Sequence, residues 1–220
     1  MEKSQKIVFL QALIVTFLIF NLGIFLGFKL EENRVNKVNT FYLESEMDLL
    51  DQRIQREIFD ITTINCDKAI EANIDFADKI FAEAKIISRY ESASRLSNEL
   101  EFQHKRFDLL RTLFWINSIR IKRDCNADYD NLVYLYKLND LSLEDKAKQS
   151  VFSNVLTDVK EKYGSKIMLI PIAADTGIPS IELLLDAYNV TELPVILINE
   201  EIQLNDLDEV KELEKYLERY

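Results

Sequence analysis

The sequence predicts an α+β protein with an N-terminal transmembrane helix, a helical stalk or hairpin bundle, and a C-terminal α/β domain with a mixed sheet. The chain has 220 residues but only four Gly and three Pro, where average usage gives about 26. None of them lies between residues 28 and 163, which excludes an all-β fold for the middle of the chain. An uncharged N-terminal run and short apolar runs in the last quarter complete the prediction.

The charge distribution limits the partners. The net charge is −11, and residues 128–220 carry 19 acidic against 9 basic side chains, or −10. An acidic C-terminal domain repels phosphate backbones, so we expect no nucleic-acid partner. Two cysteines are too few for a disulfide scaffold and are wrongly spaced for a zinc site, so no metal or cofactor is expected.

The N-terminal run defines the membrane segment. Residues 1–6 form a short tail, and residues 7–28 carry no charge. As a helix this run spans about 33 Å, enough to cross a bilayer. A cleaved signal peptide is the alternative, but residues 25–30 offer no small-residue cleavage pattern. We therefore expect an uncleaved single-pass anchor in contact with the lipid membrane.

Gly23 and Gly27 within this run have the G-x-x-x-G spacing that lets two membrane helices approach closely. The pattern also occurs by chance in apolar segments, so a homo-oligomer and an unpartnered helix both stay open. The basic residues on the two sides of the run are nearly balanced, so they do not set its orientation.

Residues 29–127 predict about three helices that run up, down and up, because apolar residues recur at steps of three and four. Weak helix formers at residues 62–65 and 92–94 divide them, with Asn65 or Ser94 as caps. A continuous helix through residues 92–94 is the alternative. The three expected apolar seams are Met47, Leu50, Ile54, Ile58 and Ile61; Ile70, Ile74, Ala77, Phe81 and Ala84; and Leu96, Leu100, Phe107, Leu110 and Phe114.

The helix order brings the two cysteines to the same end of the bundle. If the first helix ends near Thr63 and the third near Arg123, Cys66 and Cys125 both lie at the membrane-distal end. A disulfide between them closes a loop of about 59 residues, worth roughly 4 kcal/mol in the chain-entropy model. Buried free thiols are the alternative. A disulfide requires an oxidising compartment, so it favours an extracytoplasmic soluble part.

Residues 124–130 place oxygen side chains at alternate positions, as in an EF-hand loop. The sixth position needs Gly and holds Tyr129, and the twelfth needs Glu and holds Leu135. We interpret this segment as a polar turn between a helix and a strand.

The C-terminal domain, residues 128–220, alternates strands and helices. Strand–helix–strand spacing indicates parallel pairing, and a hairpin near the end implies a mixed sheet. Ser142 opens the first helix as a cap, and Gly164 ends it. The expected strands are 132–136, 166–172, 193–198 and 201–204, and the later helices are 179–188 and 207–220.

This order, β-α-β-α-β-β-α, together with the segment Ala187-Tyr188-Asn189-Val190-Thr191-Glu192-Leu193-Pro194-Val195-Ile196, resembles the thioredoxin-like fold. The resemblance covers about residues 130–220. It implies that Leu193–Pro194 is a cis peptide bond, because the family has a cis-proline before its third core strand. Family members bind extended peptides beside that proline, so the resemblance implies a contact surface there.

The sequence departs from the family where the chemistry occurs. Thiol–disulfide exchange needs a C-x-x-C at the start of the first helix, and here that position reads Asn139-Asp140-Leu141-Ser142. Neither Cys66 nor Cys125 falls there. Ser142 lacks a nearby histidine base, since His104 is expected on the polar surface of the third helix. Trp115 is expected to be a packing residue of the same helix.

The sequence therefore predicts a membrane-anchored, redox-inactive thioredoxin-like module that binds or scaffolds an unknown protein partner, and not an enzyme. Two alternatives stay open. One is a degenerate oxidoreductase accessory that uses Cys66 and Cys125, and the other is a purely structural helical membrane oligomer with a coiled coil. The sequon Asn189-Val190-Thr191 is a glycosylation site only if the domain faces outward.

Overall fold

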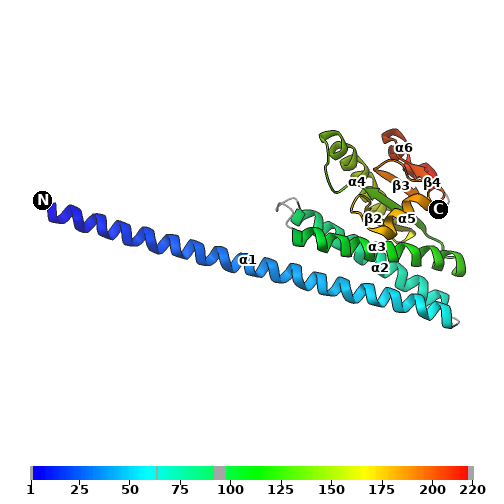
Figure 1. Ribbon diagram of the computed structural model, residues 1–220, viewed down its shortest axis with the longest axis horizontal. Coiled ribbons are helices and arrows are strands. Elements are labelled where there is room, and N and C mark those ends of the chain that lie inside the picture. Colours follow the sequence, from blue (N-terminus) through cyan, green and yellow to red (C-terminus); the bar gives the residue numbers. More distant parts are fainter. Residues whose placement is uncertain (1, 63, 92–97, 218–220) are drawn as a thin grey trace. The chain divides into compact units, whose positions relative to one another are not determined.

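The computed structural model describes residues 2–62, 64–91 and 98–217. The chain divides between Glu44 and Ser45 into two compact units. The first unit is helical, and the second contains helices and a four-stranded sheet. Figure 1 labels most of these elements along the chain.

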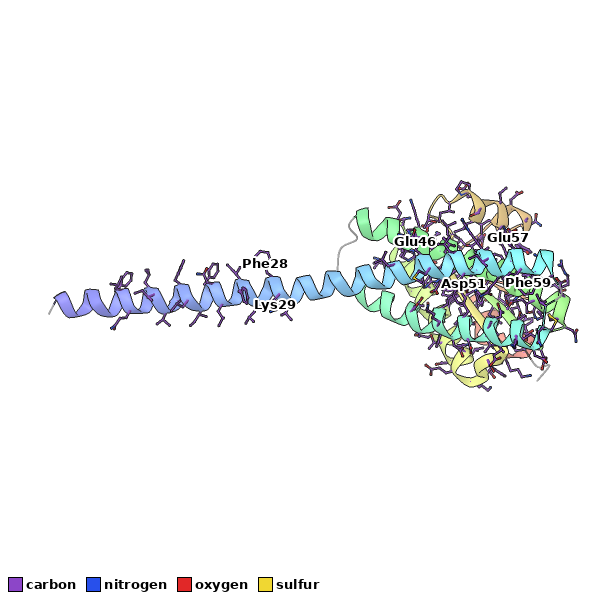
Figure 2. All side chains as sticks on the ribbon, turned by 90° about the horizontal axis from the view of Figure 1, so that it is seen from below. Phe28, Lys29, Glu46, Asp51, Glu57 and Phe59 are labelled. Atoms are coloured by element: carbon purple, nitrogen blue, oxygen red, sulfur yellow. A yellow bond between two sulfur atoms is a disulfide. The ribbon has the colours of Figure 1, made fainter. Side chains whose placement is uncertain are left out.

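The first unit is the N-terminal part of helix α1 (Glu2–Ile61). Within it, Phe9–Leu30 is long and apolar enough to span a membrane, with a mean hydropathy of 2.3. Its large side chains are exposed, as Phe28 is at 74%. Figure 2 labels Phe28 and Lys29, where the uncharged run ends.

The C-terminal part of α1 belongs to the second unit and corrects a prediction. The seam expected to pack is exposed: Met47 is 71%, Leu50 53%, Ile54 57% and Ile58 42% exposed. Ile61 lies outside the part of the chain whose side chains are described. Spacing predicts which residues share a helix face, but not which face a neighbour covers.

The face of α1 that meets the other helices is polar. Gln52 is 2% exposed, and its side-chain oxygen accepts a hydrogen bond of 2.8 Å from Asn117 Nδ2. Asp48 forms an ion pair of 2.6 Å with Lys79. These contacts explain why the polar face lies inward, because a buried amide needs a partner of the same kind.

Helices α2 (Cys66–Glu91) and α3 (Asn98–Cys125) form the predicted pair. The side chain of Asn65 accepts a hydrogen bond of 3.1 Å from the backbone N–H of Lys68, as the predicted cap. Ser94 and the second predicted break lie outside the described residues. Ala77, Phe107, Leu110 and Phe114 are buried, and Ile70, Ile74, Phe81 and Ala84 are half-buried. The described members of these two seams therefore face the interior to different degrees, and Leu96 and the side chain of Leu100 lie outside the described part.

The sheet has the strand order β2-β1-β3-β4 and is mixed, as predicted. Strand β1 pairs parallel with β2, with Leu132 opposite Leu169. Strand β3 pairs antiparallel with β1 and with β4, so Leu135 lies opposite Val195. The strands are β1 (Asp130–Tyr136), β2 (Ile167–Ala173), β3 (Val195–Ile198) and β4 (Ile202–Leu204).

Helix α4 (Leu143–Tyr163) and helix α5 (Pro179–Ala187) connect the strands. Ser142 caps α4 in a capping box with Asp145, and Gly164 ends it at a φ of 55°. Such a positive φ suits Gly because it lacks a Cβ. These residues therefore fix the helix ends that the sequence predicted.

Each face of the sheet has its own hydrophobic core. Alternate strand residues such as Val133 and Ile170 pack with α2, α3 and α5. The others, such as Leu132 and Leu169, pack with α4 and α6 (Leu207–Lys211). Figure 1 shows α2 and α3 on one side of the sheet, with α4 and α6 on the other.

The closing helix is shorter than predicted. Helix α6 ends at Lys211, and a 3₁₀ turn follows over Leu213–Tyr216. Residues 218–220 lie outside the described part. The tighter turn accompanies the burial of Val210, Leu213 and Leu217, which are all 0% exposed.

The β3–β4 hairpin is joined to α3 through Glu200. Its carboxylate accepts hydrogen bonds from Trp115 Nε1 at 2.6 Å and from Asn131 Nδ2 at 3.3 Å. Glu200 has a φ of 63°, a conformation that a non-Gly residue adopts rarely. Desolvation by burial raises the pKa of the Glu200 carboxyl. Trp115 is the single tryptophan of the chain, so its emission reports on this contact.

We predict that Glu200→Gln stabilises the protein at neutral pH. Because the folded pKa is raised, folding favours the protonated form, and stability falls as pH rises from the unfolded to the folded pKa. The side-chain amide of Gln resembles the protonated carboxyl of Glu200 and does not ionise, so the variant should keep the stability that Glu200 loses as pH rises. Thermal unfolding followed by Trp115 emission should show the gain at pH 7, and the gain should disappear in acid below the pKa of an unfolded glutamate.

Glu192→Gln is the matched control, because Glu192 is an exposed loop residue of the same type. It removes the same charge without altering the contact with Trp115, so it controls for the change in net charge. An equal effect of both substitutions would contradict a specific role for Glu200.

Candidate functional site

The contact surface that the sequence predicts beside Pro194 lies next to the end of strand β1 and the loop that follows it. The Leu193–Pro194 peptide bond is cis, and Pro194 is buried. Since Leu135 lies opposite Val195, Pro194 is next to the end of β1. The loop from Lys137 to Ser142 begins there.

That loop is anchored by Asp175, which follows β2. The two carboxylate oxygens of Asp175 accept hydrogen bonds of 2.8 Å from the backbone N–H groups of Leu138 and Asn139. Ser142 is a helix cap, and its hydroxyl lies 2.7 Å from a carboxylate oxygen of Asp145. Hydrogen bonds from Ser142 are the largest cause that lowers the pKa of Asp145. The polar side chains at this loop therefore hold its backbone in place through hydrogen bonds.

The two cysteines lie elsewhere. Cys66 is the first residue of α2 and Cys125 is the last of α3. Their sulfur atoms are 2.04 Å apart, which is the distance of a disulfide bond. The pair joins the ends of two helices and is not part of the loop beside Pro194.

The EF-hand-like oxygens do not converge. Asp124 forms an ion pair of 2.8 Å with Arg123, and Asp128 pairs with Lys166. Asp130 accepts a hydrogen bond of 2.6 Å from Asn199. Among the described residues, no group of three or more His, Cys, Asp or Glu side chains is placed to hold a metal ion.

A pocket of about 390 Å³ lies where α2, α3 and α4 meet the edge of the sheet formed by β2. Its apolar walls include Phe81, Leu156, Leu169 and Pro171. Its polar lining includes His104, Arg111, Lys146, Gln149 and Ser150. Pro194 precedes β3, on the other side of β1 from β2. This pocket is therefore a site that the sequence analysis did not predict.

His104 was expected on the surface, and that prediction is wrong. The residue is 6% exposed. Its Nδ1 lies 2.8 Å from Oδ2 of Asp108, and its Nε2 lies 3.4 Å from the hydroxyl of Tyr136. Asp108 stands one helical turn along α3 and orients the imidazole, so His104 faces the sheet instead of solvent.

Asp108 is the centre of the polar cluster. It is 0% exposed, and its Oδ1 accepts a hydrogen bond of 3.2 Å from the backbone N–H of Ala173 in β2. The same oxygen lies 3.5 Å from Nη1 of Arg111. The carboxylate thus connects α3 to the end of β2 and holds two basic side chains at the pocket.

Arg111 is buried but incompletely paired. It is 3% exposed, and its guanidinium lies 3.9 Å from the centre of the Phe107 ring. Its Nε has no hydrogen-bond partner. A buried polar group without a partner costs about 1–3 kcal/mol. Such a group at the wall of a pocket indicates a binding site more than a structural one.

Comparison with models of known protein families gives no match. Comparison with curated protein sequences also gives no match at a significant level. The interpretation of the pocket therefore depends on its geometry.

We predict that Asp108→Ala lowers the free energy of unfolding by about 3–5 kcal/mol, because it leaves Arg111 buried without a counter-charge. Asp128→Ala is the control, since the side chain of Asp128 is 74% exposed, and should cost about 0–1 kcal/mol. Urea unfolding of the full chain in detergent, followed by Trp115 emission, measures both. A loss below about 1 kcal/mol for Asp108→Ala would mean that the cluster does not hold α3 to β2.

Proposed function

We propose that the chain is a membrane-tethered, redox-inactive binding module whose C-terminal domain is thioredoxin-like. The strand order β2-β1-β3-β4, the parallel β1–β2 pair and the antiparallel β3 and β4 support the fold. The cis bond before Pro194 supports it as well. The fold alone does not specify an activity.

The pocket at the edge of β2 is the observation that carries the binding role. It is preformed, its volume is in the range of small-molecule sites, and its apolar walls surround a few polar groups. The loop Asn139–Ser142 supplies no thiol where the family performs exchange chemistry. A binding role therefore accounts for more of the structure than a redox role does.

The membrane tether is proposed from Phe9–Leu30, whose exposed apolar side chains suit a lipid environment. The disulfide between Cys66 and Cys125 favours an oxidising compartment. We therefore propose a single-pass protein whose soluble part is extracytoplasmic. In this orientation the exposed Asn189 of the sequon would be open to glycosylation.

A cysteine-labelling experiment on cells that express the full chain tests this proposal against the redox alternative. Free thiols are blocked with N-ethylmaleimide before lysis, and PEG-maleimide is added with or without prior reduction. We expect two PEG additions after reduction and none without it, because both cysteines are in the disulfide. The double variant Cys66→Ser/Cys125→Ser is the control and should gain none.

The single variants Cys66→Ser and Cys125→Ser extend the test. A redox-cycling accessory should be trapped as a mixed disulfide with another protein by one of them. The binding proposal predicts no such product on a non-reducing gel. Absence of PEG addition after reduction would mean that both cysteines were free and were blocked by N-ethylmaleimide, and it would contradict the oxidising location.

The exposed stripe of α1 favours a second candidate function, a membrane oligomer. Met47, Leu50, Ile54 and Ile58 lie at steps of three and four, as in a coiled-coil seam. They lie opposite Gln52, which is on the packed face. A second copy, tethered in the same membrane and therefore parallel, presents the same stripe, so we propose it as the occupant.

We predict that Leu50→Asn/Ile54→Asn converts a dimer of the full chain in detergent into a monomer. Both side chains are exposed within one copy, so the midpoint of thermal unfolding at low concentration should change little. Light scattering coupled to size exclusion measures the mass. Arg53→Asn, on an exposed position of the same helix, should keep the dimer. A monomeric unsubstituted chain would refute this candidate.

A further inference from the structure

Two buried cations lie on the helices that border the edge of β2, and they differ in how well they are paired. Lys160 of α4 is 4% exposed. Its Nζ donates to Asp78 at 2.8 Å, to the Gly164 carbonyl at 3.0 Å and to the Ile167 carbonyl at 2.9 Å. An ammonium has three donors, so this cation is fully satisfied by the protein.

Arg111 is buried to a similar degree and is not satisfied. A guanidinium has five N–H donors. Its hydrogen bond to Asp108 is long, at 3.5 Å, and Nε has no partner. Arg111 also lines the pocket. The contrast with Lys160 indicates that an acceptor from outside the chain completes the pairing of Arg111.

The charge of the pocket favours an anion. The described residues that line it include His104, Arg111 and Lys146, and no carboxylate is among them. Asp108 contacts Arg111 and His104, and it already accepts from the backbone of Ala173. With His104 counted as neutral at pH 7, Arg111 and Lys146 carry two positive charges against one negative charge on Asp108. This leaves one positive charge for a ligand anion, and a dianion would be repelled more strongly by Asp108.

The walls of the pocket favour an apolar body on that anion. Phe81, Leu156, Leu169 and Pro171 supply apolar surface. The rings of Tyr134 and Tyr136 are stacked, with centroids 5.4 Å apart. Burial raises the pKa of Tyr134, so its phenol stays protonated. The volume of about 390 Å³ lies within the range of small-molecule sites.

We propose that this pocket binds a small monocarboxylic acid with an aromatic or aliphatic body, and that Arg111 binds the carboxylate. A guanidinium suits a carboxylate because its planar N–H donors match the two oxygens. The apolar walls enclose the rest of the ligand. This inference rests on the proposed binding function and names its ligand class.

Saturation-transfer NMR and calorimetry on the full chain in lipid nanodiscs test the proposal, with 3-phenylpropionate as the probe. The uncharged 3-phenylpropanamide is the matched control ligand, because it has the same shape without the charge. We expect the acid to bind at least about tenfold more tightly than the amide, a difference of about 1.4 kcal/mol. Equal affinities, or no binding of the acid at millimolar concentration, would overturn the proposal.

Two variants locate the site. Arg111→Met should remove the preference for the acid, and Trp115 emission with circular dichroism checks that it is folded. Ser150→Phe places a ring at an exposed position of the lining. By steric exclusion it should weaken the binding of both ligands at least about tenfold. Because Ser150 is exposed, the substitution should leave the fold intact. Unchanged acid binding in folded Arg111→Met, or in Ser150→Phe, would overturn the assignment.

The outcome is separable from that of the thiol experiment. If the acid does not bind and the disulfide is stable, the proposed ligand class is refuted and the proposal of a redox-inactive module stands. If a mixed disulfide is trapped and the acid still binds, the redox-inactive function is refuted and the assignment of the pocket stands.

Discussion

The need to cover both faces of a four-stranded sheet determines how the second unit is built. One face is covered by α4 and α6, which come from the sheet's own connections. On the other face, α5 has only nine residues and covers part of the surface. Helices α2 and α3 complete this layer with Ala77, Ile80, Phe114 and Trp115. The helical pair is therefore part of the folded core, because burial of apolar surface is the main stabilising contribution.

A helical layer that precedes the sheet in sequence has to be oriented by specific contacts. Asn73 of α2 donates 3.1 Å hydrogen bonds to Ser118 and to the hydroxyl of Tyr129. Ser118 donates at 2.6 Å to Asn131 of β1. Burial raises the pKa of Tyr129 to about 12, so the phenol remains a neutral donor. Fully satisfied networks of this kind specify one arrangement of the layer, and that arrangement brings Asp108 to the end of β2.

Local signals explain which parts of this fold follow from the sequence. Helix α4 was predicted well because Ser142 and Gly164 act through their own backbone neighbourhood. The exposure of the α1 stripe was missed because it depends on which polar partners α2 and α3 present. The burial of His104 was missed for the same reason. Its steps of four and three to Asp108 and Arg111 place all three on one helix face, and this polar stripe beside an apolar seam is the signal that predicts a buried site.

The pocket follows from how the edge strand β2 is protected. An exposed strand edge invites pairing with another chain, and Pro171 lacks the N–H that such pairing uses. Lys160 of α4 reaches Asp78 of α2, so the two layers meet around the edge of β2. Phe81 of α2 and Lys146 of α4 both line the pocket, so these two helices flank it. The protected edge and the position of the pocket therefore have one cause: two helical layers, held apart by the sheet, meet beyond β2 without filling all the space between them.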